Sequence, residues 1–540
     1  MDQQDYDGIV IGGGHNGLIL AAYLARAGLR VLVLERQIEV GGGLDTHEDV
    51  RAPGFYHNVH SVFHRMVTDL PWYRDLELDG LGCRYVRPDV GCAHLFSDGR
   101  AILWHSDVER TAASIARFSP HDAQTYRQLR QEWAPIVRDI VTPETYHAPL
   151  PYAEKAALLE TSAVGREYLQ LAALSPVEVV DEYFRDEQLK AMLLYLGVMR
   201  GYDIYSRGLG YLIPVQVVTG VNPQLCVGSS HQLAHFLEEA VWHAGGEVRE
   251  RSRVVRLLIE GGRATGVELW DGSTIRARRF VASSIDPHQT FLDLAGAEHL
   301  APEFAARVKA FRYSLVGPIF ALNLSLSERP VYRNEAYDPD VGRALLTIIG
   351  LDHSDDIAEL YRAHREGWLP RKLFFNGTTP TVFDPSQAPP GKHTAFMWPL
   401  LPYHLKDGGP ARWDEVKEQF FDLYLARWRE FAPNLNAANI VSRGCSTPLD
   451  IERHLPNMVG GDWMVGEMNT EQCLDKRPLP ELSSHRTPIG NLYLCGSCCH
   501  PGGNITGAPG YNAARVIAHD LGLRPWWQPH DVHQRWEKLR

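Results

Sequence analysis

Three glycines near the start of the chain have the spacing at which a protein backbone can bind a diphosphate. Gly12, Gly14 and Gly17 form a G-x-G-x-x-G pattern directly after an apolar run, and Glu35 ends the next apolar run. The first glycine permits a tight turn, the second lets the backbone approach a pyrophosphate, and the third lets a helix pack on a strand. A carboxylate placed like that of Glu35 accepts hydrogen bonds from ribose hydroxyls. The pattern predicts a dinucleotide, NAD or FAD, bound by Gly12, Gly14, His15, Asn16, Gly17, Glu35 and Arg36.

A strand, a helix and a second strand must hold these residues in place. Residues 6–11 form an apolar run typical of a strand, residues 18–27 have a helical pattern, and residues 30–34 are a second strand-like run. The amino end of the helix then faces the phosphates with free N–H groups and a partial positive charge. Because all three elements occur in the required order, we expect a Rossmann-type nucleotide-binding unit here.

The overall composition is that of a globular protein with more than one domain. The chain has 540 residues, of which 44% are hydrophobic and 22% are charged, and its formal net charge is −12. This acidic balance argues against a dedicated nucleic-acid-binding protein. Eight cysteines are too few for a disulfide scaffold and no signal peptide precedes the first strand, so a cytoplasmic location is expected. Residues 18–34 are the best candidate for a membrane span, but Arg26, Gly28 and Arg30 interrupt them.

Two further glycine-rich segments lie at opposite ends of the sequence. Gly41, Gly42 and Gly43 follow Glu35 closely, and five glycines occur between residues 496 and 510. Glycine has no side chain to keep a flat ring away from the backbone N–H groups. Residues 513–521 then form a helical run, and the amino end of a helix stabilises negative charge on a reduced flavin.

Both segments resemble FAD-binding proteins of the amine oxidase and phytoene desaturase type. Residues 500–514 are similar to the C-terminal flavin motif of bacterial carotenoid ketolase and phytoene dehydrogenase-related flavoproteins. The resemblance implies FAD as the cofactor, with Gly42 and Gly43 along the dinucleotide and the backbone of Val254 at the adenine. The flavin-binding residues that it implies are Gly496, Gly503, Asn504, Gly510 and Asn512.

The same resemblance implies an α/β fold made of two interleaved domains. A split Rossmann-type FAD-binding domain, similar to that of glutathione reductase, is expected to carry an inserted α+β substrate-binding domain. The FAD-binding domain is expected to comprise residues 1–75, 225–300 and 455–525, and the substrate-binding domain residues 76–224 and 301–454, followed by a tail, 526–540. Gly261 and Gly262 mark a hairpin rather than a second dinucleotide pattern, so no separate domain for NAD(P)H is expected.

Hydrophobic periodicity predicts the main elements outside the N-terminal unit. Apolar residues at helical spacing predict helices over residues 107–118, 123–141, 152–174, 229–244 and 413–431. In the last of these helices, Leu423 and Trp428 are expected to be buried. Strands are expected over residues 247–260, 265–270, 322–326 and 394–398.

Histidines and cysteines offer further candidates for chemistry. His57, His60 and His64 could be metal ligands, but zinc sites draw on a wider ligand set, and no metal is predicted. Because its segment leads to the substrate side of the flavin in the resembling family, His60 is a candidate catalytic group, and His500 beside the flavin loop is a second one. Cys495 and Cys498 form a C-x-x-C pattern without a partner pattern, so packing is the favoured interpretation.

The resemblance therefore implies an FAD-dependent oxidoreductase that desaturates or oxidises a small apolar substrate by hydride transfer to flavin N5. Amine dehydrogenation is the redox alternative, and a non-redox flavin-dependent isomerase or hydratase, or a flavin-containing binding protein, remains open. No nucleic acid is expected as a partner. The tail tryptophans, Trp526, Trp527 and Trp536, leave a peripheral membrane contact open. The sequence specifies neither the electron acceptor nor the oligomeric state.

Overall fold

The N-terminal strand–helix–strand unit has the predicted order. The computed structural model describes residues 5–220 and 222–540. Strand β1 (Tyr6–Ile11), helix α1 (His15–Arg26) and strand β2 (Val31–Leu34) follow one another, and β1 pairs with β2 in parallel. Helix α1 begins earlier than expected, so His15 and Asn16 belong to its first turn. The glycine loop is therefore shorter than expected, and the amino end of α1 follows Gly14 directly.

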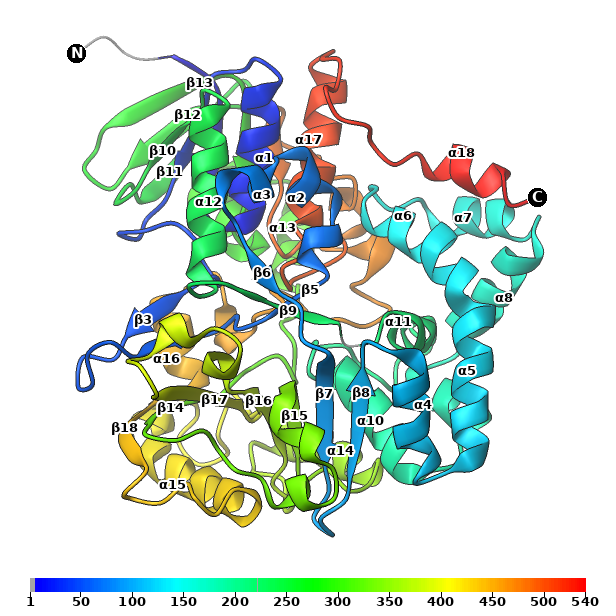
Figure 1. Cartoon of the computed structure of the whole chain (residues 1–540). Coiled ribbons are helices and arrows are strands. Elements are labelled where there is room, and N and C mark those ends of the chain that lie inside the picture. Colours follow the sequence, from blue (N-terminus) through cyan, green and yellow to red (C-terminus); the bar gives the residue numbers. More distant parts are fainter. Residues whose placement is uncertain (1–4, 221) are drawn as a thin grey trace.

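A parallel sheet is built from segments at both ends and the middle of the chain. Its strands follow the order β10-β2-β1-β13-β19 (Figure 1). The amino-terminal part of β13 also pairs with β12, which forms an antiparallel pair with β11. The remaining bounds are β10 (Glu247–Arg249), β11 (Val254–Glu260), β12 (Arg263–Leu269), β13 (Thr274–Ser283) and β19 (Leu492–Leu494). Because the central strands run in parallel, their carboxyl ends meet at one edge, where α/β sheets bind their ligands.

Three helices pack side by side against this sheet. Helices α12 (His231–His243) and α17 (Ala508–Asp520) both contact α1 (Figure 1). A Cβ atom on Gly510 of α17 would overlap the carbonyl oxygen of Asn16, so this glycine allows the two helices to approach closely. Helix α17 begins at Ala508 rather than near 513, which places Gly510 and Asn512 inside the helix and not in the preceding loop.

A second sheet lies at the opposite end of the molecule. Its strand order is β18-β14-β17-β16-β15-β7-β8, and helix α15 (Trp413–Phe431) covers it through Trp413 and Trp428 (Figure 1). Leu423, expected to be buried, is 42% exposed, while Phe421 and Leu425 are buried. The bounds are β7 (Val90–Leu95), β8 (Ala101–His105), β14 (Ala321–Leu326), β15 (Ala344–Ile349), β16 (Phe375–Thr378), β17 (His393–Trp398) and β18 (Ile440–Ser446).

A helical layer flanks the second sheet. It comprises α4 (Val108–Ala116), α5 (Pro120–Pro135), α7 (Tyr152–Leu159), α8 (Ala163–Ala172), α10 (Glu187–Val198) and α11 (Leu212–Thr219). The single helix predicted over 152–174 is divided because Ser162 caps α8 and accepts a hydrogen bond from the backbone N–H of Gly165 at 2.9 Å. Apolar side chains of α10 and α11 form one core with the second sheet, so the helical layer and the sheet pack as a unit.

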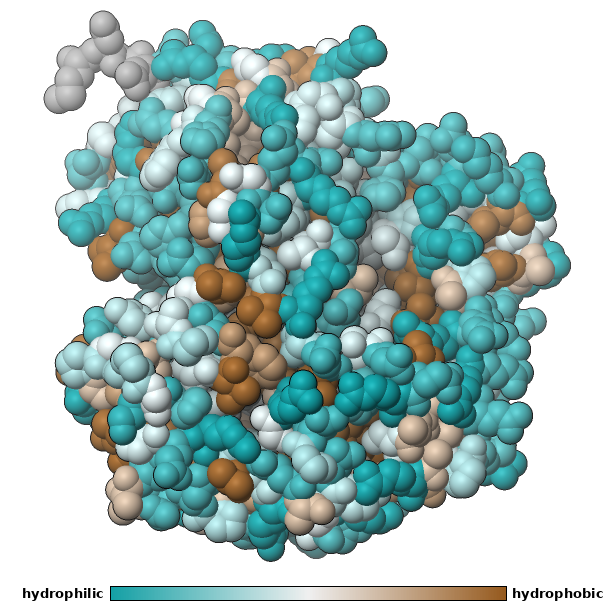
Figure 2. Space-filling view, viewed as in Figure 1, coloured by the Kyte–Doolittle hydropathy of each residue, from teal (hydrophilic) through white to brown (hydrophobic). Residues whose placement is uncertain are grey.

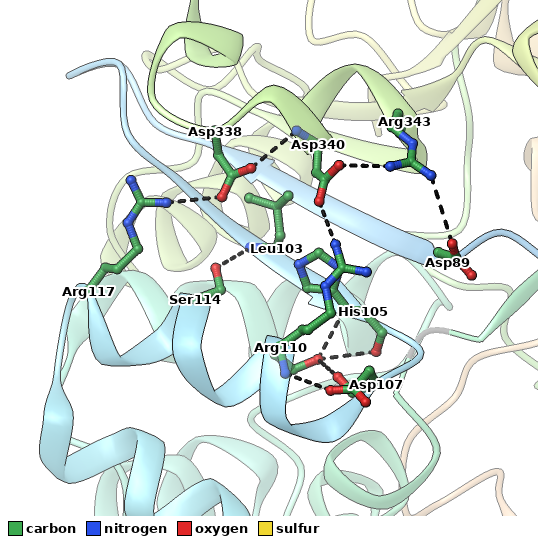
Figure 3. Close-up of polar contacts among 11 residues, drawn as sticks. Asp89, Leu103, His105, Asp107, Arg110, Ser114, Arg117, Asp338, Asp340 and Arg343 are labelled. Carbon is green, nitrogen blue, oxygen red and sulfur yellow. Dashed lines mark hydrogen bonds and ion pairs between the residues drawn. The ribbon is translucent and has the colours of Figure 1, made fainter.

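Ion pairs fasten helix α4 to the turn that leads into β15 (Figure 3). Arg117 lies 3.0 Å from Asp338, Arg110 lies 2.5 Å from Asp340, and Arg343 also contacts Asp340 at 3.1 Å. Such exposed pairs each contribute at most about 1 kcal/mol, but several in a network fix the relative position of two elements. The pairs made by Arg110 and Arg117 join segments of the chain that are more than two hundred residues apart in sequence.

The C-terminal tail packs onto the protein instead of projecting from it. The ring of Trp526 lies 5.2 Å from that of Tyr23, and Trp527 and Trp536 are buried. The burial of Trp527 and Trp536 therefore gives no support to a peripheral membrane contact through the tail tryptophans. Among the described residues, no helix has the length and apolar character needed to cross a membrane.

Candidate active site

A cavity of about 450 Å³ opens at the carboxyl edge of the parallel sheet. Ile11 and Leu34 end strands β1 and β2, Ser284 follows β13, and Ser497 lies just beyond β19, and all four line it. From there the cavity continues toward the helical layer, where Leu196 of α10 forms part of its wall. In the space-filling view, apolar side chains gather between the parts that hold the two sheets (Figure 2). The cavity thus joins a nucleotide-binding edge to an apolar chamber.

The glycine loop leaves open the space that a diphosphate needs. Gly14 has an extended backbone, with φ −69° and ψ 166°, and a Cβ atom built on it would meet no other atom within 4 Å. Because Gly14 lines the cavity, this free direction points into it. The second glycine segment runs alongside, since the N–H of Gly41 donates to the carbonyl of Gly13 at 2.9 Å, and Gly42 and Gly43 also line the cavity.

Glu35 is fixed in the orientation that a ribose-binding acid requires. One carboxylate oxygen accepts a hydrogen bond from the N–H of Gly13, and the other accepts one from the N–H of Gln37, each at 2.8 Å. The remaining lone pairs are available at the cavity, which Glu35 lines together with Arg36 and Val254. The acid therefore couples the position of the glycine loop to the adenosine end of the site.

Unsatisfied polar atoms at the start of α1 mark a place for a polar ligand. The Nε2 atom of His15 and the Oδ1 atom of Asn16 are buried and have no hydrogen-bond partner among the described residues. Both residues line the cavity, and so does Asn504, which has a positive φ of 69°. Burial lowers the pKa of His15 to about 4, which keeps it neutral. Buried polar groups without partners are rare, so their cluster beside the open Gly14 fits a bound FAD.

Some residues of the glycine-rich C-terminal motif line the cavity, and the others pack against neighbouring parts of the fold. Asn504, Ile505 and Thr506 line the cavity, and the indole N–H of Trp72 donates to the carbonyl of Thr506 at 2.6 Å. Several residues expected to bind FAD lie outside the lining; these are Gly17 of the diphosphate loop and Gly496, Gly503, Gly510 and Asn512 of the flavin motif.

Close packing explains why these residues are small or polar. A Cβ on Gly17 would overlap the carbonyl of Gly12, and one on Gly496 would overlap that of Ser284. A Cβ on Gly503 would lie 2.7 Å from the carbonyl oxygen of Trp463. The Asn512 side chain donates to the carbonyl of Thr145 at 3.1 Å. These residues position the cavity wall rather than form it.

The three histidines of the sequence pattern point to different partners. The Nε2 atom of His57 lies 3.0 Å from the Ser325 hydroxyl, and His64 Nδ1 lies 2.6 Å from the Tyr85 hydroxyl. Only His60 and His64 line the cavity. The three do not meet around a common point, and this geometry gives no support to the metal-site alternative.

His60 and His500 occupy unlike environments. Both ring nitrogens of His60 are buried without a hydrogen-bond partner among the described residues, and the side chain lines the cavity. Burial lowers its pKa to about 4, so the imidazole is neutral at physiological pH. His500 lies outside the lining, where its Nε2 is 3.0 Å from the carbonyl oxygen of Glu144, so it is placed to hold the loop rather than to meet a substrate.

The far end of the cavity uses residues that sequence reasoning missed. Its apolar walls are Phe63, Leu196, Met199 and Trp398. Arg65, Arg200 and Gln216 lie among them. One signal was available, because Arg200 directly follows the long apolar run of helix α10, where an isolated cation is unusual.

Fold and cavity together define a dinucleotide-binding α/β protein with an attached apolar chamber. Residues 17–518 match the family described as flavin containing amine oxidoreductase, and the chain belongs to this family. It is an FAD-dependent oxidoreductase. The cofactor expected from the glycine pattern and the resemblance is thereby confirmed as FAD.

Individual relatives place the chain within this family. It is 35% identical to one of the component chains of limonene dehydrogenase from Castellaniella defragrans, over 98% of each chain. A lycopene-forming phytoene desaturase from a Paracoccus species is 25% identical over 95% of this chain and 97% of its own. The solved structure of cyclohexylamine oxidase from Brevibacterium oxydans matches with a TM-score of 0.57 at 16% identity, covering 96% of this chain and all of that one. The structural likeness shows the fold alone.

Proposed function

We propose that the protein dehydrogenates a small organic substrate with a largely apolar body. The observation that carries the proposal is the continuity of the cavity from the glycine loop to walls of Phe63, Leu196, Met199 and Trp398. Apolar walls bind an apolar body by the hydrophobic effect and exclude water from the reacting bond. The relatives named for limonene and phytoene support this choice of substrate class.

The chain's own groups bind the cofactor, orient the substrate and accept a proton. Bound FAD supplies the hydride acceptor. Removing two hydrogens from adjacent carbons also releases a proton, and the neutral imidazole of His60 in the cavity wall is placed to accept it. The amino end of α1 and the carboxylate of Glu35 would hold the diphosphate and ribose.

We further propose the division of labour expected from the sequence. Residues 1–75, 225–300 and 455–525 would carry FAD, and residues 76–224 and 301–454 would enclose the substrate. The strands of the parallel sheet come from the first set, and those of the second sheet from the other. All eight cysteines are free, which suits a cytoplasmic, reducing location.

Anaerobic mixing with candidate substrates tests the proposed reaction. We expect that a cyclic or linear terpenoid bleaches the flavin absorbance of the purified protein, because hydride transfer reduces the ring. An amine of the same size should bleach it poorly. Product formation with no change in the flavin oxidation state would instead favour the isomerase or hydratase alternative, and bleaching by amines alone would favour the amine oxidase alternative.

NADH and NADPH should reduce the protein poorly. The structure holds one glycine pattern in a strand–turn–helix setting, and Gly261 and Gly262 form the hairpin between β11 and β12. A nicotinamide therefore has no second nucleotide-binding unit among the described residues. Stopped-flow absorbance under anaerobic conditions measures this reduction, and rapid stoichiometric bleaching by micromolar NADPH would contradict the expectation.

Replacing His60 by phenylalanine should slow turnover by roughly a hundredfold while FAD remains bound, because the proton acceptor is lost. His57 is the matched control, since it is buried in the same segment but lies outside the cavity lining, and His57→Asn should retain most activity. Since burial lowers the pKa of His60 to about 4, the wild-type rate should be independent of this group from pH 6 to 8. Equal rates for His60→Phe and wild type would exclude His60 as the acceptor.

A further inference from the structure

Two arginines lie in the apolar end of the cavity. Arg65 ends strand β5 (His64–Arg65), and its guanidinium donates to the Thr219 hydroxyl at 3.0 Å and to the Gly220 carbonyl at 2.6 Å. Arg200 follows helix α10 and lies 5.7 Å from the ring centroid of Tyr202. Its Nε atom is buried without a hydrogen-bond partner, and it forms no ion pair, within the ranges 5–220 and 222–540.

No carboxylate among the described residues that line this end of the cavity balances the charge of Arg200. Among the described lining residues, the only acids are Glu35 and Asp293. Glu35 is bound to the N–H of Gly13, and Asp293 lies on the π-helical segment His288–Ala295, which packs against β11 near Val254. Both acids therefore belong to the nucleotide end.

Burying two like charges together is unfavourable unless something of opposite charge joins them. Burial lowers the pKa of Arg65 well below its usual value, and the nearby positive charge of Arg200 lowers it further. A guanidinium group offers a planar set of N–H donors that matches the two oxygens of a carboxylate. The indole N–H of Trp398, also without a partner among the described residues, adds a donor to the same walls.

We propose that the substrate carries a carboxylate at one end of its apolar body and that Arg200, supported by Arg65, binds this group. The inference rests on the proposed function, because it takes the apolar chamber as the place of the substrate. It narrows the substrate class from an apolar molecule to an apolar acid. It also disfavours amines, since a protonated amine would face the cation of Arg200 with no acid nearby among the described lining residues.

Ligand binding to the FAD-loaded protein tests the proposal without turnover. Cyclohexanecarboxylate, cyclohexylmethanol and cyclohexylamine share one apolar body and differ in the charge of the attached group. We expect titration calorimetry and the flavin difference spectrum to show the carboxylate binding at least about tenfold more tightly than the alcohol, with the amine weakest. Equal binding of carboxylate and alcohol would overturn the proposal.

Variants assign the preference to Arg200. Arg200→Met should lose the advantage of the carboxylate while the affinity for the alcohol changes less than twofold, and Arg200→Lys should keep part of it because the charge remains. Arg207 is a matched control, since its side chain is 67% exposed and lies outside the cavity, and Arg207→Met should leave the preference intact. Arg65 is left unchanged because it also holds residues 219 and 220 in place.

Two results separate this inference from its alternatives. If Arg200→Met shifts the flavin potential but keeps the carboxylate preference, the arginine serves the flavin ring, and the proposal is wrong. Failure of the proposed function would give a different result. In that case neither acidic nor neutral apolar compounds would bleach the wild-type flavin, although the carboxylate could still bind tightly.

Discussion

Replacing Gly14 by valine should remove FAD from the purified protein while leaving the fold intact. The backbone at Gly14, with φ −69° and ψ 166°, is one that valine adopts readily, and the new side chain would meet no protein atom within 4 Å of its Cβ. It would instead occupy the part of the cavity where a diphosphate must approach the backbone. We expect FAD affinity to fall by at least about tenfold, equivalent to about 1.4 kcal/mol.

The ratio of flavin to protein absorbance after gel filtration measures this loss, and the circular dichroism spectrum checks the fold. Gly14→Ala, with a smaller side chain, should show an intermediate loss. Gly17→Val is the contrasting variant, because its side chain would overlap the carbonyl of Gly12 and should destabilise the protein itself. Full FAD content in Gly14→Val would mean that the diphosphate does not pass this loop.

Acidification should destabilise the protein steeply below pH 6.5. Burial lowers the pKa of a set of buried histidines from 6.5 to about 3 or 4; they are His15, His57, His60, His64, His94, His485 and His500. Between the folded and the unfolded pKa, the unfolded chain binds more protons, so stability is full above pH 6.5 and is lost as the pH falls.

The size of this effect follows from the depression of the pKa. A histidine with a pKa of about 4 in the folded chain and 6.5 in the unfolded chain costs about 3 kcal/mol at pH 4 relative to neutral pH. Domains have a total stability of about 5–15 kcal/mol, so a few such residues suffice for acid unfolding. We expect the midpoint of unfolding to lie between pH 4 and 6, as measured by tryptophan fluorescence across a pH series.

His94 offers a direct check of this explanation. Its side chain is fully buried against Phe96, with ring centroids 4.4 Å apart, and it lies outside the cavity. His94→Phe should weaken the dependence of melting temperature on pH below 6.5. Phe96→Leu perturbs the same packing without removing a titratable group, so it should lower the melting temperature equally at each pH. A melting temperature that stays constant from pH 7.5 to 5 would refute the argument.

The parts of the fold that sequence reasoning predicted are those specified by short-range patterns. The strand, helix and second strand around Gly12 and Glu35 depend on periodicity and turn chemistry within one segment, and the structure matches them closely. Helix α15 also has the predicted bounds, whereas the exposure of Leu423 shows that periodicity alone does not identify which face meets the sheet. The helix over 152–174 was predicted too long because the cap at Ser162 was overlooked.

The same distinction between short-range patterns and tertiary packing applies to the residues of the candidate site. Gly14, Glu35 and Gly42 belong to a sequence pattern, and all three line the cavity. Arg65 and Arg200 are brought together only by tertiary packing, so no local pattern connects them. Glycines near the C-terminus illustrate a different difficulty, because Gly503 and Gly510 are equally compatible with a flavin contact and with the close packing that the structure shows.

The order in which the cavity wall appears along the chain limits when the cofactor can bind. Its lining begins at Ile11 and ends at Thr506, and Thr506 is held by the indole of Trp72. At about 5–20 residues per second, a ribosome needs roughly 25–100 s to proceed from the first to the last of these residues. The cavity wall is therefore complete only after Thr506 has been synthesised, and until then the nascent protein must keep the edge of β13, where β19 finally pairs, from pairing with other strands.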